Sequence, residues 1–245
     1  MTFFVGTSGF SYKEWKGVFY PDKIKDKEML AYYASQLSAV EINNTFYRMP
    51  KREVLRGWAE ATPEDFSFII KASRRITHFK RLKEADETMG YLMGNTAELG
   101  SKLGALLFQL PPNMRCNLER LKPFLDLIPE EIPATFEFRH PSWFDDSVFE
   151  VLKARNIPIC HADSEDSELP FVVTADWGYL RLRKPGYDKR ALNKWLKEIA
   201  RAGWKDAHVF FKHEDAGAGP KMALKFLSLV GEEPQRFLNE KLNGS

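Results

Sequence analysis

The sequence has few cysteines, no long apolar run and no recognisable secretory signal. It contains only 2 cysteines among its 245 residues, Cys116 and Cys160, and they form no CxxC pair. This excludes a disulfide framework and a cysteine-built zinc site, and it fits a reducing compartment. The most apolar run, residues 103–110, is too short to cross a bilayer, and the first residues lack the basic and apolar regions of a secretory signal. We therefore expect a cytoplasmic protein without a membrane segment.

The chain also lacks a strong net charge and internal boundaries. Lys and Arg number 36 against 34 Asp and Glu, so the net charge is +2 and no whole-molecule field attracts polyanions. No Gly/Ser-rich linker, repeat or low-complexity segment interrupts the sequence. With 44% hydrophobic residues, the chain can bury a substantial core. We expect residues 1–245 to form one domain.

Short β-branched or aromatic runs alternate with longer amphipathic stretches. This alternation is typical of parallel βα units. We expect eight strands, over residues 3–7, 39–43, 66–72, 105–110, 135–139, 157–163, 179–183 and 208–213. Helices are expected over residues 27–37, 53–61, 88–99, 118–127, 148–155, 192–202 and 221–230. Together they predict an α/β fold, a single (β/α)8 TIM-type barrel, with a doubly wound sheet as the structural alternative.

The sixth connection has no clear helical pattern. Residues 164–168 read SEDSE, and residues 171–174 read FVVT. This composition favours a loop followed by a small extra strand. We expect the sixth helix of the barrel to be short or replaced by a loop.

Polar side chains gather at the predicted carboxyl-terminal ends of the strands, where TIM-type barrels carry their functional residues. Residues two apart on a strand point to the same side, and the apolar residues between them are expected to face the helices. We therefore expect the charged pairs to face the barrel axis. These pairs are Glu137 with Arg139, Arg181 with Arg183, and His161 with Asp163.

Two interpretations account for such buried charges. One is a salt-bridged plug, in which Glu137 binds Arg139 or Lys71 and Asp163 binds Arg181. We favour a ligand site, because buried ion pairs are weak evidence for stability. Cations outnumber carboxylates in this set, which favours a small anionic ligand, carboxylated or phosphorylated. Glu137 and Asp163 are then the expected catalytic base and acid.

Histidines at three strand ends make a metal site conceivable. His140, His161 and His213 match no HExxH-type motif, and the neighbouring cations oppose metal binding. We expect no metal ion and no other cofactor. Ser8 lies in a glycine-bounded turn that does not match GxSxG, so a tight strand exit is favoured over a nucleophile.

Aromatic and basic loops leave a nucleic-acid partner possible. Residues 10–20 and Phe46 with Tyr47 follow the first two strands and suit stacking on a base or sugar ring, or a packed rim. The basic run over residues 71–83 suits phosphate groups, or is a solvated charged loop. A nucleic-acid-binding or nucleic-acid-processing barrel is therefore an alternative function, and a non-catalytic ligand sensor is another.

Five motifs occur in a characteristic order, namely GTSGFSY at 6–12, VEINNTFY at 40–47, ITH at 76–78, QLPP at 109–112 and EFRHPSW at 137–143. They resemble the YecE-like family, domain of unknown function 72, over about residues 3–230. The resemblance implies a TIM-type barrel and brings no established activity. It implies a site at motif positions without assigned roles, namely Glu41, Asn43, Lys71, His78, Gln109, Glu137, Arg139, His140 and Asp163.

Two segments depart from the pattern of many relatives. Where those carry Arg-x-His-Gly after the seventh strand, this chain has RLRK at 181–184, and where they carry Tyr-Phe-Asn-Asn on the eighth, it has FFKHE at 210–214. Charge replaces amides there, so we expect the ligand preference to differ within the family. The predicted ligand-binding set, including these changes, is Glu41, Asn43, Lys71, His78, Gln109, Arg139, His140, Arg181 and Arg183.

Overall fold

Eight parallel strands form a nearly closed barrel in the computed structural model, which describes residues 1–163, 170–184, 186–212 and 217–231. The strands neighbour one another in the order β5, β4, β3, β2, β1, β8, β7 and β6. A backbone bridge between Phe136 and Ile159 brings the two ends of the sheet together. The strands are β1 (Thr2–Thr7), β2 (Ala39–Ile42), β3 (Ser67–Lys71), β4 (Leu103–Gln109), β5 (Ala134–Glu137), β6 (Cys160–Asp163), β7 (Trp177–Leu182) and β8 (Asp206–Phe211). The predicted TIM-type barrel is confirmed.

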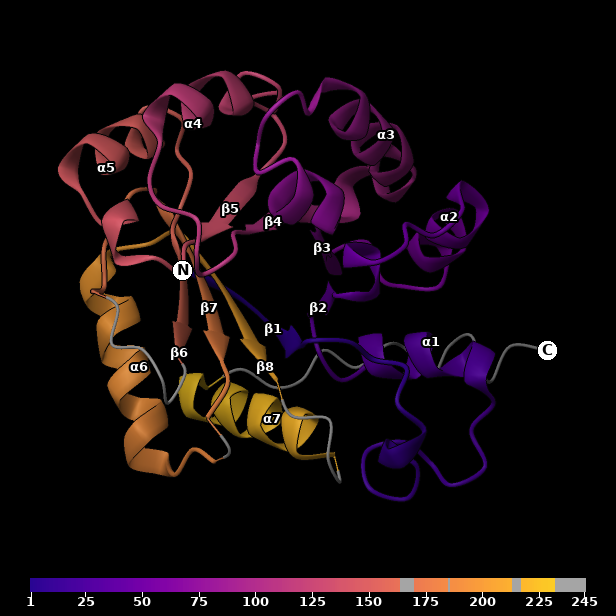
Figure 1. Cartoon of the computed structure of the whole chain (residues 1–245). Helices are drawn as coiled ribbons and strands as arrows, with labels where there is room; N and C mark the ends of the chain where they lie inside the picture. Colours follow the sequence, from indigo (N-terminus) through magenta and orange to yellow (C-terminus); the bar gives the residue numbers. More distant parts are fainter. Residues whose placement is uncertain (164–169, 185, 213–216, 232–245) are drawn as a thin grey trace.

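Helices surround the strands, as Figure 1 shows. They are α1 (Met29–Ala34), α2 (Arg52–Glu60), α3 (Asp86–Thr96), α4 (Leu118–Leu125), α5 (Asp146–Lys153), α6 (Lys189–Ala202) and α7 (Ala218–Val230). Each overlaps the range that the hydrophobic pattern predicts. Among the described residues, no helix has the length and apolar character needed to cross a membrane, and the longest, α6, has 14 residues.

Helix α6 shows why the sequence pattern locates helix ends well. The carboxylate of Asp188 accepts a hydrogen bond from the backbone N–H of Ala191 at 2.7 Å, which satisfies one of the free amides of the first turn. At the other end, Gly203 adopts φ 68°, a left-handed conformation that glycine takes without steric cost. Both signals are local in sequence and therefore readable without the fold.

The connection between β6 and β7 contains no helix over its described residues, 170–176. The predicted extra strand over residues 171–174 is wrong, since this segment forms no backbone ladder. Side chains hold it instead: the ring of Phe171 stacks on His161 at 4.1 Å, and the Thr174 hydroxyl donates to the Ile157 carbonyl at 2.7 Å. The predicted loop over residues 164–168 lies outside the described residues.

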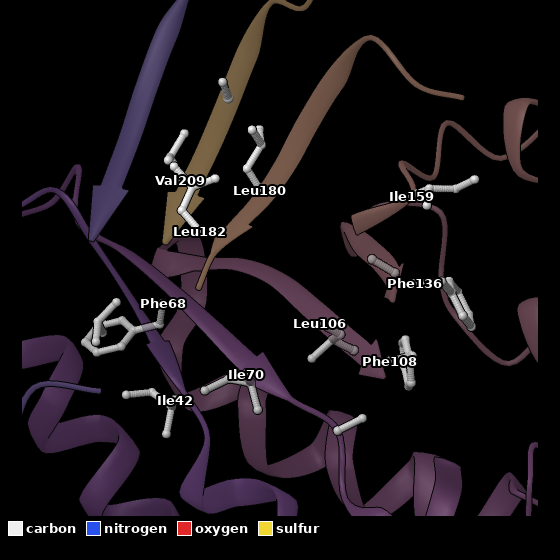
Figure 2. Packing of buried hydrophobic residues seen from close by; sticks show 14 of the residues in the cluster. Ile42, Phe68, Ile70, Leu106, Phe108, Phe136, Ile159, Leu180, Leu182 and Val209 are labelled. Atoms are coloured by element: carbon white, nitrogen blue, oxygen red, sulfur yellow. The ribbon is translucent and has the colours of Figure 1, made fainter. Parts of the chain in front are cut away.

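The outer faces of the strands form the main hydrophobic core against the helices. Phe68, Leu106 and Val209 are completely buried there, and Figure 2 shows part of this packing. The inner faces form a separate apolar cluster, Ala39, Ile69, Ala105, Leu107, Cys160, Tyr179 and Phe210. This cluster fills the barrel below its carboxyl-terminal end, so it closes the floor of any site above it.

Candidate functional site

Arg181 joins two buried carboxylates at the carboxyl-terminal end of the barrel. Its Nη2 donates to Oε1 of Glu41 on β2 at 2.7 Å, and its Nη1 donates to Oε2 of Glu137 on β5 at 2.5 Å. None of the three side chains is more than 2% exposed. Side-chain alternation along the strands therefore brings Glu41, Glu137 and Arg181 to the barrel axis, where opposite charges compensate for lost hydration.

Glu41 accepts hydrogen bonds from three further side chains besides Arg181. Its Oε1 accepts from the Ser8 hydroxyl and the Asn43 amide, both at 2.9 Å, and its Oε2 accepts from the Tyr179 hydroxyl at 2.6 Å. Burial alone would raise the pKa of Glu41, but Arg181 and the hydrogen bonds from Tyr179 and Asn43 hold it below its ordinary value. Because four side chains donate to it, Glu41 acts as an anchor for its neighbours.

Glu137 accepts hydrogen bonds from four side chains. The donors are Arg181, Gln109 at 2.8 Å, Arg139 at 2.9 Å and Arg183 at 3.3 Å. Burial opposes ionisation, but Arg181, Arg183 and Arg139 outweigh it and lower the pKa of Glu137 far below its usual range. A carboxylate this acidic is a weak base, so the geometry favours Glu137 as the organiser of the arginines over its expected role as the catalytic base.

Lys71, at the end of β3, lies beside this network without an ion pair to any carboxylate of the described residues. Its ammonium lies 4.4 Å from the centre of the Phe46 ring, a cation–π contact. Burial and the Arg181 guanidinium lower the pKa of Lys71 to about 8, against the opposing effect of Glu41 and Glu137. Its proton is therefore exchangeable near neutral pH.

Three arginines of the cluster differ in exposure and in the hydrogen-bond donors that they leave unused. The Arg139 side chain is 35% exposed, so its guanidinium reaches solvent at the barrel mouth. Nε of Arg181 and Nε of Arg183 are buried and have no hydrogen-bond partner among the described residues. Such unsatisfied buried donors are costly to stability.

Two predicted histidines lie at the edge of the mouth. His78 belongs to a short helical turn, Arg75–Phe79, and contacts the Phe46 ring edge-on at 4.9 Å. Burial, together with the nearby cations Lys71 and Arg139, lowers the pKa of His78. His140 instead accepts from the Ser142 backbone N–H at 3.1 Å and caps the turn Pro141–Trp143. His78 therefore contacts Phe46, and its Nδ1 shares a hydrogen bond with the Thr77 hydroxyl at 2.9 Å, while His140 is engaged in local structure.

The predicted inward direction of His161 and Asp163 is wrong. On β6 it is Cys160 that belongs to the inner cluster, so the alternate residues His161 and Asp163 face outward. Asp163 pairs with Lys184 at 2.8 Å and accepts from the Tyr187 hydroxyl at 2.9 Å, and the predicted ion pair with Arg181 is absent. Asp163 therefore lies apart from the Glu137 cluster, which removes support for its role as the catalytic acid.

Residues after β8 contribute less to the charged cluster than the strand pattern predicts. Lys212 is exposed, and His213 and Glu214 lie outside the described residues. Within the described part of the chain, no group of three or more His, Cys, Asp or Glu side chains is arranged to hold a metal ion. The organised charge is therefore the cluster built from Glu41, Glu137 and their cationic partners.

Two members of the cluster were missed by sequence reasoning. Tyr179 precedes Arg181 by two residues on β7, so the same alternation that turns Arg181 inward predicts the position of the tyrosine. Ser8 follows β1 and reaches Glu41, which is 33 residues away along the chain. That contact has no local sequence signal, because it depends on the pairing of β1 with β2.

The chain is similar to bacterial proteins along most of its length. The family model described as "Protein of unknown function DUF72" matches residues 4–244. UPF0759 protein YecE of Escherichia coli (strain K12) is 34% identical over 113 residues, which are 46% of this chain and 42% of YecE. The matched segment thus spans less than half of YecE. UPF0759 protein YunF of Bacillus subtilis (strain 168) is 28% identical over 211 residues, 79% of this chain and 73% of YunF.

Solved structures of the same family share the barrel. A DUF72 family protein from Thermotoga maritima MSB8 has a TM-score of 0.83 and 27% identity, covering 95% of this chain and 100% of that one. Another DUF72 family protein, from Enterococcus faecalis V583, has a TM-score of 0.76 and 20% identity, covering 94% of this chain and 98% of that one. At this identity the similarity supports the fold alone. The sequence motifs, the barrel and the family match agree: this chain belongs to the DUF72 family.

Proposed function

We propose that this protein is an enzyme that binds a small carboxylated or phosphorylated molecule at the carboxyl-terminal end of its barrel, without a metal ion or other cofactor. The observation that carries the proposal is the excess of positive charge in the cluster. Four cations, Lys71, Arg139, Arg181 and Arg183, surround two carboxylates, Glu41 and Glu137. An anionic group would balance this excess.

The roles of the residues follow from their partners. Glu41 and Glu137 fix the arginines and remain ionised throughout the working pH range. Arg139 and Arg183 offer donors to the anion, since each has a single carboxylate partner, Glu137. Lys71 has a pKa near the working pH and moves a proton on the bound substrate, a role that suits a general acid or base.

Metal independence follows from the same charges. A divalent cation needs free carboxylate or imidazole ligands, and the two carboxylates of this cluster are already occupied by arginine, amide and hydroxyl donors. Elemental analysis of the purified protein tests this point. We expect substoichiometric zinc, manganese and iron, and a stoichiometric metal that survives chelation would contradict it.

Phosphate binding tests the anion site directly. Isothermal titration should show phosphate binding to the wild-type protein, weakened about tenfold or more in Lys71→Met, because one charged partner is worth roughly 1.5–3 kcal/mol. Lys153→Met, at an exposed lysine that ends α5, is the matched control and should bind as the wild type does. Equal phosphate affinity in Lys71→Met and the wild type would refute the site.

A further inference from the structure

A large hollow adjoins the charged cluster. Its volume is about 930 Å³, and it lies between the loops after β2 and β3 and the start of α3. Pockets of roughly 300–1,000 Å³ accommodate small organic ligands. Its walls include Tyr47, Arg48, Lys51, Arg75, Phe79 and Tyr91. None of the arginine–glutamate contacts described above involves these residues, so the hollow is a separate feature.

Exposed aromatic rings are concentrated in this hollow. Among the described residues, the exposed large hydrophobic side chains include three aromatic ones, Tyr47 at 68%, Phe79 at 68% and Tyr91 at 61%. All three line the same hollow. Rings left in water at one place are typical of a surface that binds another flat or apolar group.

The same walls are positively charged. Arg48, Lys51, Arg75 and Lys80 line the hollow against one carboxylate, Glu87. The ligand that suits this surface therefore carries negative charge as well as a flat ring.

One cation also holds the rings in place. The guanidinium carbon of Arg74 lies 5.3 Å from the centres of both the Tyr47 and the Phe79 rings. The contact with Tyr47 links the loop after β2 to the turn after β3.

Phe46 connects the hollow to the charged cluster. Its ring contacts the Lys71 ammonium and, at 5.0 Å, the Tyr47 ring edge-on. A ligand that lies over Tyr47 is therefore separated from Lys71 by one aromatic residue. A single molecule with a ring at one end and an anionic group at the other can contact both places.

We propose that this hollow is the subsite for the heterocyclic base of a nucleoside phosphate, whose phosphate binds at Lys71 and the neighbouring arginines. This inference rests on the proposed function, because it names the class of its substrate. The base stacks on Tyr47 or Phe79, and Arg48 and Arg75 on the walls of the hollow add positive charge that attracts the anionic ligand. Stacking on aromatic side chains accepts any base, so the subsite selects the class of ligand and not one base.

Titration with adenosine 5′-monophosphate, ribose 5-phosphate and inorganic phosphate tests the subsite. Adenosine 5′-monophosphate should bind about tenfold more tightly than ribose 5-phosphate, since stacking of a base on an aromatic side chain strengthens binding. Tyr47→Leu and Phe79→Leu keep an apolar side chain but lose the ring, and they should reduce this preference while leaving ribose 5-phosphate binding unchanged. Tyr47→Phe keeps the ring and should retain the preference for adenosine 5′-monophosphate. Because both residues are exposed, equal melting temperatures verify the fold of each variant.

The outcomes separate the subsite from the proposed function. Equal affinity for adenosine 5′-monophosphate and ribose 5-phosphate would overturn the subsite and leave the anion site standing. Nucleotide binding that responds to Tyr47→Leu but not to Lys71→Met would retain the subsite and overturn the anion site. A thymidine oligonucleotide whose affinity exceeds that of the mononucleotide and rises with length would overturn the proposal in favour of a nucleic-acid strand.

Discussion

Replacing Glu137 with glutamine keeps the shape of the side chain and removes one negative charge from the centre of the barrel. Glu137 then no longer balances Arg139, Arg181 and Arg183, which lie within 3.3 Å of its oxygens. Arg181 retains its ion pair with Glu41 at 2.7 Å, so it is not left fully unpaired. The substitution leaves four cations against one carboxylate in the cluster.

The expected loss of stability follows from this partial compensation. Removing one partner of a buried ion pair costs about 3–5 kcal/mol, and the remaining Glu41 contact favours the lower end, about 3 kcal/mol. In a protein of this size 1 kcal/mol shifts the melting temperature by roughly 2–4 °C, so the expected fall is about 6–12 °C. Phosphate should stabilise Glu137→Gln more than the wild type, because the variant cluster has a larger excess of positive charge.

Urea unfolding and thermal melting with and without phosphate measure both effects. Glu98→Gln is the matched control, because Glu98 forms an exposed ion pair with Arg56 at 2.9 Å and should cost less than about 1 kcal/mol. A loss no larger than that of the control would refute the anchoring role of Glu137. A large loss without any additional effect of phosphate would show that the cluster is a salt-bridged framework and not an anion site.

Three further predictions concern single groups. Lys71 loses its proton as pH rises through about 8, so the affinity for sulfate, whose charge is constant over this range, should fall between pH 7 and 9 in the wild type and stay level in Lys71→Arg, as titration calorimetry would reveal. Burial lowers the pKa of His208 to about 3, so the unfolded state binds its proton first and stability should fall as pH drops below about 6.5. Between pH 6.5 and 5, urea unfolding should show that His208→Phe loses about 2 kcal/mol less free energy of unfolding than the wild type. Equal losses in the two proteins would contradict the assignment to His208. A methyl group at Gly178 would lie 2.0 Å from the Trp204 ring, so Gly178→Ala should destabilise by about 3 kcal/mol in a urea titration, whereas Gly57→Ala, with nothing within 4 Å, should be neutral or slightly stabilising.

Much of the fold follows from local sequence signals. Strands and helices bury one face each, and their apolar periods of two and about 3.6 residues are visible in the chain itself. Capping residues mark the ends of α6 for the same reason. The prediction over residues 171–174 was wrong because a β-branched run has strand propensity, but a strand also needs a neighbour with free backbone groups. There the side chains of Phe171 and Thr174 found partners instead.

The sequence by itself determined that Glu137, Arg181 and Arg183 share the inside of the barrel, because side-chain direction along a strand is a local property. It did not determine the face of β6, a strand of four residues whose pattern Cys-His-Ala-Asp allows either direction. Only the tertiary structure decided that Cys160 packs inward and Asp163 pairs with Lys184. Likewise, the contact of Arg181 with Glu41 joins residues 140 positions apart, and it exists because closure of the barrel brings β2 and β7 to a common axis.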